Sequence, residues 1–475
     1  MYIKREKPFS SMPKCNLIRE FRAPFLLFIF TISILLILLS IGLTSVNSAA
    51  PTIMDPKLKV EVLFSGLKFP TSMAFLGSND MLVLEKNDGT IQRIVNGTLQ
   101  AKPILDVNVA KRSERGMLGI AIENNRDQNV GSPPYVFLYF TESSKKDGSD
   151  ISEGQEPLGN RLYRYELVGD KLVNPKLLLD LPAGPYPYHN GGRIVIGPDH
   201  NVYLAIGDLG NFTEAQNMKH RADIDGRGGI LRVMQDGKPV GKGILGGNYP
   251  VNLYYAYGVR NSFGMDFDPV TNQLWDTENG DHYGDEINLV YPGFNSGYRK
   301  MQGVWKAYQS EPGPVLSNPI EGLVDFGGKG KYSMPEFTWN ATIGVTALSF
   351  FNSQKLGKLY ENDLFVGDFN NGNIYRFELN KDRSALVLQN QLSDKIADTN
   401  KENAEVTFGT GFGGITDMQL GPDGYLYVLS IHEGGTDCYA EISNNTTDTT
   451  DPCVKYDSGL QGTIFRIVPA NSKSN

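Results

Sequence analysis

The chain has 475 residues, with 52 glycines, 26 prolines, 11% aromatic residues and a formal net charge of −8. Abundant turn-forming and aromatic residues favour an all-β protein over a helical one. The chain is acidic and has no basic stripe after residue 50, so we expect no nucleic-acid partner.

The first 50 residues differ in composition from the rest. Six lysines and arginines between Lys4 and Arg22 precede an uninterrupted apolar run over residues 25–43. This order predicts a basic cytoplasmic tail, one hydrophobic helix, and an extracytoplasmic remainder. The sequence leaves a cleaved signal peptide and an uncleaved membrane anchor as alternatives. We therefore expect two parts: 1–50 as tail and membrane segment, and 51–475 as an exported domain that is secreted or anchored.

A hairpin pattern recurs from about residue 70 to the end of the chain. In it, an apolar strand leads into a turn rich in Pro, Asp, Gly or Asn, and a second apolar strand follows. The clearest copy is Ile415–Leu429, with its turn at Gly421–Gly424. The other five copies are Thr71–Leu84, Gly116–Phe140, Arg193–Ala205, Ser262–Trp275 and Ala347–Val366.

A third strand follows each hairpin, usually with an arginine between apolar neighbours, as in Gly229–Val233. Six such units predict an all-β, six-bladed β-propeller, which closes into a ring and leaves only short sheet edges. The alternative, two stacked β-sandwiches, does not account for six copies of one hairpin. In a propeller, the loops at the mouth of the ring are where ligands bind.

The run Tyr188–Asp199 contains one of only five histidines in the chain, His189. Two glycines and an apolar stretch follow shortly after it, which places the imidazole at the entrance of a strand with little bulk around it. A near-neutral imidazole on a rigid rim suits a general base for alcohol oxidation. The alternative is a histidine that only satisfies turn backbone. Asp208 follows nineteen residues later.

Three other segments combine glycines with charged residues near expected strand ends. Glu114 precedes a glycine-flanked strand, and Arg260 with Asn261 lies at the entrance of another. The segment 278–286 contains four carboxylates, those of Glu278, Asp281, Asp285 and Glu286. Hard cations prefer such oxygen ligands on flexible backbone, so this loop is a candidate calcium site, with a polar surface turn as the alternative.

Together these segments resemble the glucose/sorbosone dehydrogenase family, six-bladed quinoproteins that use pyrroloquinoline quinone (PQQ), over roughly residues 60–468. The resemblance implies that His189 is the general base and that Arg260 and Asn261 hold the reactive edge of the quinone. It implies that Asp208 contacts the substrate, and we expect Glu114 and Tyr188 beside it. The expected calcium ligands are Gly280, Asp281, Asp285 and Glu286. Among them, the resemblance implies that the backbone carbonyls of Gly280 and Asp281 hold the ion that bridges to PQQ.

The resemblance breaks in the last two blades. Gly414 and Thr416 stand where the family usually has two arginines that hold carboxylates of PQQ, and Asn370 replaces an expected lysine. Each charge-assisted pair contributes about 1.5–3 kcal/mol, so the loss of three cations weakens the binding of a tricarboxylate strongly. Three cations from insertions are candidate replacements: Arg299, Lys329 and Lys331.

The sequence therefore predicts an exported PQQ- and calcium-dependent aldose dehydrogenase that oxidises the C1 hydroxyl of sugars to lactones. No Cys-x-x-Cys-His haem motif is present, so the electron acceptor is expected to be a separate molecule. Two alternatives stay open. One is a propeller without quinone that binds carbohydrate or a cell-surface partner, and the other is a calcium-dependent hydrolase or lactonase.

Export also bears on covalent modification. Cys438 and Cys453 are the only two cysteines beyond the hydrophobic segment, so we expect a local disulfide between them, with zinc binding as the weaker alternative. Five sequons are candidate glycosylation sites: Asn96, Asn211, Asn340, Asn444 and Asn445.

Overall fold

The computed structural model describes residues 50–123, 133–146, 157–304, 306–307, 320–431 and 461–472. By contacts, the chain divides into Met1–Ala49 and Ala50–Asn475, and every described residue belongs to the second unit. The expected N-terminal hydrophobic helix and the pair Cys438 and Cys453 lie outside the described residues. Among the helices that are described, none has the length and apolar character needed to cross a membrane.

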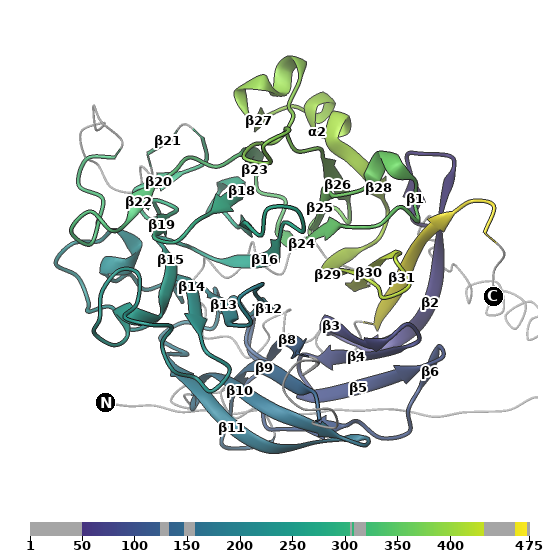
Figure 1. The fold of residues 1–475 in the computed structure, drawn as a ribbon, viewed down its shortest axis with the longest axis horizontal. Coiled ribbons are helices and arrows are strands. Elements are labelled where there is room, and N and C mark those ends of the chain that lie inside the picture. Colours follow the sequence, from purple (N-terminus) through teal and green to yellow (C-terminus); the bar gives the residue numbers. More distant parts are fainter. Residues whose placement is uncertain are drawn as a thin grey trace, which may run out of the picture. The chain divides into compact units, whose positions relative to one another are not determined.

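Strands dominate the described residues (Figure 1), which form six sheets of at least four strands and one two-stranded ribbon. The first three sheets in chain order start at β3, β8 and β12. They contain β3 (Pro70–Gly77), β4 (Asp80–Glu85), β5 (Thr90–Val95), β6 (Thr98–Leu99) and β7 (Leu105–Asp106); β8 (Met117–Glu123), β9 (Tyr135–Glu142), β10 (Gly159–Val168) and β11 (Lys171–Leu181); and β12 (Ile194–Ile196), β13 (Val202–Ile206), β14 (Gly229–Val233), β15 (Tyr254–Tyr257), β19 (Phe294–Asn295) and β22 (Lys331–Tyr332).

The remaining sheets start at β16, β24 and β29. They contain β16 (Ser262–Phe267), β17 (Leu274–Glu278), β18 (Tyr283–Val290), β23 (Phe337–Ala341) and β27 (Ile396–Ala397); β24 (Val345–Phe351), β25 (Asp363–Asp368), β26 (Ile374–Phe377), β28 (Thr407–Thr410) and β1 (Thr52–Ile53); and β29 (Gly414–Leu420), β30 (Leu426–Ile431), β31 (Gln461–Pro469) and β2 (Leu58–Lys68). The ribbon pairs β20 (Met301–Gln302) with β21 (Lys306–Ala307).

Helix is scarce in the described ranges. One short α-helix, α2 (Asn400–Val406), begins with a capping box in which Thr399 and Glu402 satisfy each other's backbone N–H groups. The 3₁₀ turns are η2 (Glu214–Gln216), η3 (Val251–Leu253), η4 (Lys358–Tyr360) and η5 (Asn390–Asp394). The all-β propeller expected from the sequence is confirmed, and each of the expected hairpins is formed by two paired strands.

The first strands of the sheets line the centre of the ring. In Figure 1, β3 lies beside β8, β8 beside β12, β12 beside β16, β16 beside β24, β24 beside β29, and β29 beside β3. The second strand of each sheet is covered on both faces by its neighbours and is therefore largely buried. All five residues of β13 are buried, for example. The core therefore lies between the sheets, and the loops that precede the first strands gather at one rim.

The ring is closed by strands from both ends of the described chain. The N-terminal strand β2 pairs antiparallel with the C-terminal strand β31, with Leu58 opposite Pro469 and Lys68 opposite Gln461 (purple and yellow in Figure 1). This pairing covers the edge of β31 and makes β2 the outer strand of the last sheet. Sequence analysis did not predict it, because β2 lies before the first recognised copy of the hairpin.

A buried ion pair crosses the centre of the ring. Arg193 Nη1 lies 2.6 Å from Asp417 Oδ1, and the two side chains are 9% and 1% exposed. Arg193 comes just before β12 and Asp417 lies in β29, strands that are three places apart around the ring. The other Asp417 oxygen accepts the Ser72 hydroxyl and the Met73 backbone N–H from β3. The pair therefore ties opposite sides of the ring together.

Removal of one partner should leave the other charged group buried and unpaired. We expect Asp417→Ala to lower the free energy of unfolding by about 3–5 kcal/mol, measured by denaturant melts. As a control, Asp88→Asn removes a partner of Lys68 in a pair that is 44% and 74% exposed, and it should change stability by less than about 1 kcal/mol. Equal effects of the two variants would contradict a structural role for the central pair.

Candidate functional site

The predicted site residues lie at one rim of the ring because of where the strands begin and end. Glu114, His189 and Asn261 precede the first strands β8, β12 and β16, whereas Asp208 and Gly280 follow the second strands β13 and β17. In an antiparallel hairpin, the start of the first strand and the end of the second lie at the same edge. The fold thus brings residues that are far apart in the sequence to one place.

His189 and Asp208 form a hydrogen-bonded pair. The His189 Nδ1 atom lies 2.6 Å from Asp208 Oδ1, with the imidazole 14% exposed and the carboxylate fully buried. A carboxylate accepts hydrogen bonds, so Nδ1 donates to Asp208, and in the neutral imidazole the lone pair is on Nε2. Asp208 is itself fixed by the Gly210 N–H at 2.7 Å and through its own N–H to the Arg260 carbonyl. The pair has the arrangement of an oriented general base.

The backbone at His189 is held in an unusual conformation. His189 has φ 60°, in the left-handed region that is costly for a residue with a side chain. Glu114 accounts for its persistence, because its Oε2 atom accepts the His189 backbone N–H at 2.8 Å. The same oxygen accepts the Asn261 side-chain amide at 3.2 Å. Glu114, which we predicted to bind substrate, therefore acts in this structure by joining the entrances of three strands.

Asn261 is likewise engaged within the protein, since its side-chain oxygen accepts the Gly191 N–H at 3.2 Å. Gly191 has φ 63°, and a Cβ there would lie 2.5 Å from the Ala205 carbonyl oxygen. Only glycine permits this close approach of the His189 segment to β13. The glycines after the histidine, which drew attention to the segment in the sequence, are thus explained by backbone packing.

Arg260 is the cation of the site. Its backbone N–H donates to Glu278 Oε1 at 2.7 Å, and its Nη1 donates to the Asn279 carbonyl at 3.1 Å. Burial acts to lower the pKa of Arg260, but the surrounding acidic groups outweigh it and raise the pKa, so the guanidinium stays charged. Its Nε atom is buried without a hydrogen-bond partner among the described residues. A buried guanidinium with an unused donor suits an anion or a polar oxygen from a ligand.

The acidic loop does not present its side chains as a metal cage. Asp285 accepts three backbone N–H groups, from Gly280 at 2.7 Å and from Ile343 and Gly344 at 2.8 Å each. Glu286 accepts the Gly303 N–H at 2.5 Å and the Asn288 amide at 3.3 Å. Within the described ranges, no three His, Cys, Asp or Glu side chains are grouped to hold a metal ion. Calcium ligation by Gly280, Asp281, Asp285 and Glu286 stays a prediction.

Three buried carboxyls lie on the neighbouring strands β17 and β18. Burial raises the pKa of Asp276 to about 7. Burial also raises the pKa of Glu278 and of Glu286, and the charge of Asp276 raises both further. Sequence analysis singled out Glu278 and Glu286 but missed Asp276, whose place in β17, two residues before Glu278, is the signal that was available. Of this acidic cluster (Asp276, Glu278 and Glu286), Glu278 contacts the predicted cation of the site by accepting the Arg260 backbone N–H.

Comparison with known proteins decides the family. The family model described as Glucose / Sorbosone dehydrogenase matches residues 67–437. The chain belongs to the glucose/sorbosone dehydrogenase family. Its relatives include Aldose sugar dehydrogenase YliI of Escherichia coli, 25% identical over 83% of this chain and 95% of that protein. The resemblance inferred from the sequence is therefore confirmed.

Solved structures of related proteins agree. A structure of an oxidoreductase (glucose dehydrogenase) from Thermus thermophilus has a TM-score of 0.61 and 26% identity, over 86% of this chain and all of that one. The PQQ-bound form of Aldose Sugar Dehydrogenase from Streptomyces coelicolor has a TM-score of 0.58 and 21% identity, over 88% of this chain and all of that one. The second likeness supports the fold alone.

The end of the site that would hold the cofactor carboxylates is unusual for the family. The Phe369 ring packs against Gly414, so that a Cβ on Gly414 would lie 2.9–3.2 Å from ring atoms. The Thr416 hydroxyl is directed to the Leu429 carbonyl at 3.4 Å. Arg193, which reaches the neighbouring residue Asp417 from the opposite side of the ring, is already paired with that carboxylate. The residues present thus fit the reactive edge of a quinone, but these positions offer no cation to its carboxylates.

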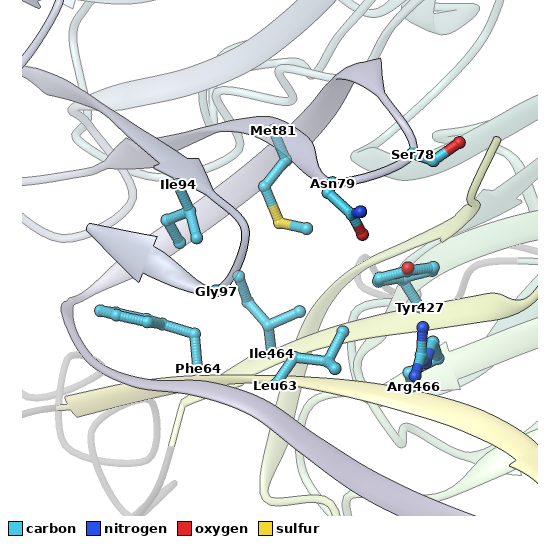
Figure 2. Close-up of a pocket in the computed structure, with 10 residues that line it drawn as sticks. All are labelled: Leu63, Phe64, Ser78, Asn79, Met81, Ile94, Gly97, Tyr427, Ile464 and Arg466. Atoms are coloured by element: carbon cyan, nitrogen blue, oxygen red, sulfur yellow. The ribbon is translucent and has the colours of Figure 1, made fainter. Parts of the chain in front are cut away.

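A small pocket lies elsewhere, between the first and last sheets (Figure 2). Leu63 and Phe64 of β2 and Ile464 of β31 form an apolar side, and Tyr427 and Arg466 lie at the other. None of its ten lining residues is a predicted site residue. The residues that line this pocket include no histidine or carboxylate that could act as a base, so the rim at His189 remains the candidate site.

Glu114→Ala should release the His189 backbone from its anchor while it leaves the imidazole in place. We expect kcat for sugar oxidation to fall by about 10²-fold with a smaller change in KM, because misplacement of a catalytic group costs rate rather than binding. Glu114→Gln keeps an oxygen acceptor and should retain most of the activity. A raised KM with unchanged kcat would instead assign Glu114 to the substrate contact predicted from the sequence.

The raised pKa of Asp276 makes stability depend on pH. The unfolded chain releases this proton near 3.8 and the folded protein near 7, so the stabilisation is present below about pH 4 and is lost as pH rises through about 7. We expect the unfolding free energy of the chelator-treated protein to fall by up to about 4 kcal/mol across this window.

Thermal melts at a series of pH values measure this dependence. Asp276→Asn should reduce the slope of the curve, with the remaining slope due to Glu278 and Glu286, whereas Asp88→Asn, which changes an exposed carboxylate, should leave the curve unchanged. An Asp276→Asn protein with the full wild-type slope would contradict the assignment.

Proposed function

We propose that this protein is an exported sugar dehydrogenase, a six-bladed quinoprotein that oxidises the C1 hydroxyl of aldoses to lactones. The observation that carries the proposal is the His189–Asp208 pair at 2.6 Å on the ring rim, in a chain of the glucose/sorbosone dehydrogenase family. Aldose sugar dehydrogenase YliI, which matches most of this chain, supports sugar as the substrate class.

In the proposed reaction, His189 Nε2 accepts the proton of the C1 hydroxyl. Asp208 keeps the proton on Nδ1 and stabilises the imidazolium that forms. PQQ, when bound, supplies the two-electron acceptor that takes the C1 hydride. The Arg260 guanidinium stabilises negative charge on an oxygen at the reacting edge, and its burial strengthens that interaction.

Cofactor retention is proposed to rest on Arg260 and on calcium held by the backbone carbonyls of Gly280 and Asp281. Of the candidate replacement cations, Arg299 has the most direct link to the site. It stacks on Phe212 with 4.3 Å between the guanidinium carbon and the ring centroid, and Phe212 belongs to the loop that begins at Asp208. With fewer cations than usual, binding should be weak enough for a modest ionic strength to release the cofactor.

A second function is favoured by one observation. Phe369 covers Gly414, where the family usually has an arginine. A propeller that has lost the quinone and binds carbohydrate or a surface partner would have this feature. The hydrolase alternative has less support, because Glu278 and Asp285 already accept backbone N–H groups.

Export, membrane anchoring or secretion, the disulfide between Cys438 and Cys453, and glycosylation at the sequons belong to this proposal. Their common basis is the basic segment followed by an apolar run before residue 50. A separate electron acceptor also belongs to the proposal, because the sequence has no Cys-x-x-Cys-His haem motif.

His189→Ala removes the proposed base and tests the function directly. We expect dye-linked oxidation of aldoses, measured with added PQQ and calcium, to fall by about 10²–10⁴-fold, without loss of folding stability. His200→Ala is the matched control, because His200 is 67% exposed and pairs with Glu123 away from the proposed base. Wild-type rates in the His189→Ala protein would exclude the proposed mechanism.

A further inference from the structure

Two tyrosines extend outward from the proposed base. The Tyr188 ring contacts the His189 ring edge-on, with 4.9 Å between centroids. Tyr186 then stacks on Tyr188, with 5.3 Å between centroids and 10° between ring planes. The three rings form a continuous row that begins at the imidazole. Tyr186 is 46% exposed, so the outer end of the row faces solvent.

The loop that carries Asp208 braces this row. Gly210 has φ 66°, and a Cβ there would lie 2.5 Å from Tyr188 Cε2 and 2.9 Å from Tyr186 Cδ2. The Gly210 N–H also donates to Asp208 at 2.7 Å. The loop therefore fixes the edges of both tyrosines and the orienting carboxylate at once. The aromatic row is thus held rigidly relative to the base.

The surroundings of the row combine apolar faces with polar groups. The charges of Asp208, Arg260 and Glu114 all act on the Tyr188 hydroxyl. Neither tyrosine hydroxyl has a hydrogen-bond partner among the described residues. Rigid aromatic faces with nearby polar groups suit a pyranose, whose C–H face packs on a ring while its hydroxyls form hydrogen bonds at the edge.

We propose that Tyr186 and Tyr188 form an aromatic subsite for sugar rings beyond the one that is oxidised. The ligand class is a short oligosaccharide whose reducing end lies at His189 and whose outer ring packs on the face of Tyr186 that Tyr188 leaves open. The inference rests on the proposed function for the identity of the reacting end. The site residue that it adds is Tyr186, and Tyr188 contributes through its ring rather than through charge.

The test compares glucose with cellobiose and cellotriose, which share the same reducing-end ring. We expect Tyr186→Ala to lower the ratio of kcat/KM for the oligosaccharides to that for glucose by about tenfold, the upper range for an aromatic contact. Tyr186→Phe keeps the ring and should retain most of the wild-type ratio. Tyr249→Ala, which removes another exposed tyrosine, should not change it.

An unchanged ratio in Tyr186→Ala would overturn the subsite. A weaker affinity for PQQ in this variant, with no change in the ratio of kcat/KM for the oligosaccharides to that for glucose, would also overturn it, because the tyrosines would then contact the cofactor. Binding of cellotriose, followed by tyrosine fluorescence without cofactor, separates this inference from the proposed function. Binding that Tyr186→Ala abolishes, in a protein that oxidises no sugar, would support the subsite and reject the dehydrogenase. Absence of cellotriose binding in the wild type would overturn the subsite.

Discussion

A single carboxylate oxygen connects the parts of the rim on which the candidate chemistry depends. Glu114 Oε2 accepts one N–H from the His189 backbone and one from the Asn261 side chain. Each of these three residues precedes the first strand of a different sheet, so the contact sets the spacing of neighbouring sheets at the mouth of the ring. It also holds His189 in a left-handed conformation that isolated backbone disfavours. In this conformation the His189 imidazole forms its hydrogen bond with Asp208.

The ring geometry makes such a contact possible. The pairing of β2 with β31 joins the two ends of the described chain in the last sheet, and the Arg193–Asp417 pair joins opposite sides across the centre. Both features limit how far the sheets can move relative to one another. A rigid ring suits a site assembled from loop residues, because catalytic groups need to be held within a fraction of an ångström.

Much of the fold could be predicted because its signals are local. The turn at Gly421–Gly424 and its counterparts mark the hairpins, and apolar runs such as β13 mark strands covered on both faces. Residues such as His189 and Arg260 were found from strand-end motifs. Long-range partnerships left no local signal: the β2–β31 pairing, the bond from Glu114 to the His189 backbone, and the Tyr186 stack. The contacts of Asp285 left no local signal either, since its carboxylate accepts backbone N–H groups from Gly280, Ile343 and Gly344, whereas its spacing in the sequence predicted only a cation.

The central claim is that the rim around His189 and Arg260 still binds a quinone although Gly414, Thr416 and Asn370 supply no cation. Titration of the purified protein with PQQ in excess calcium, followed by quinone absorbance at increasing salt, tests it most directly. The account predicts saturable binding that weakens as salt rises and that supports oxidation of aldoses. Absence of binding at any calcium concentration would contradict it and would assign this rim to a propeller that binds carbohydrate without oxidising it.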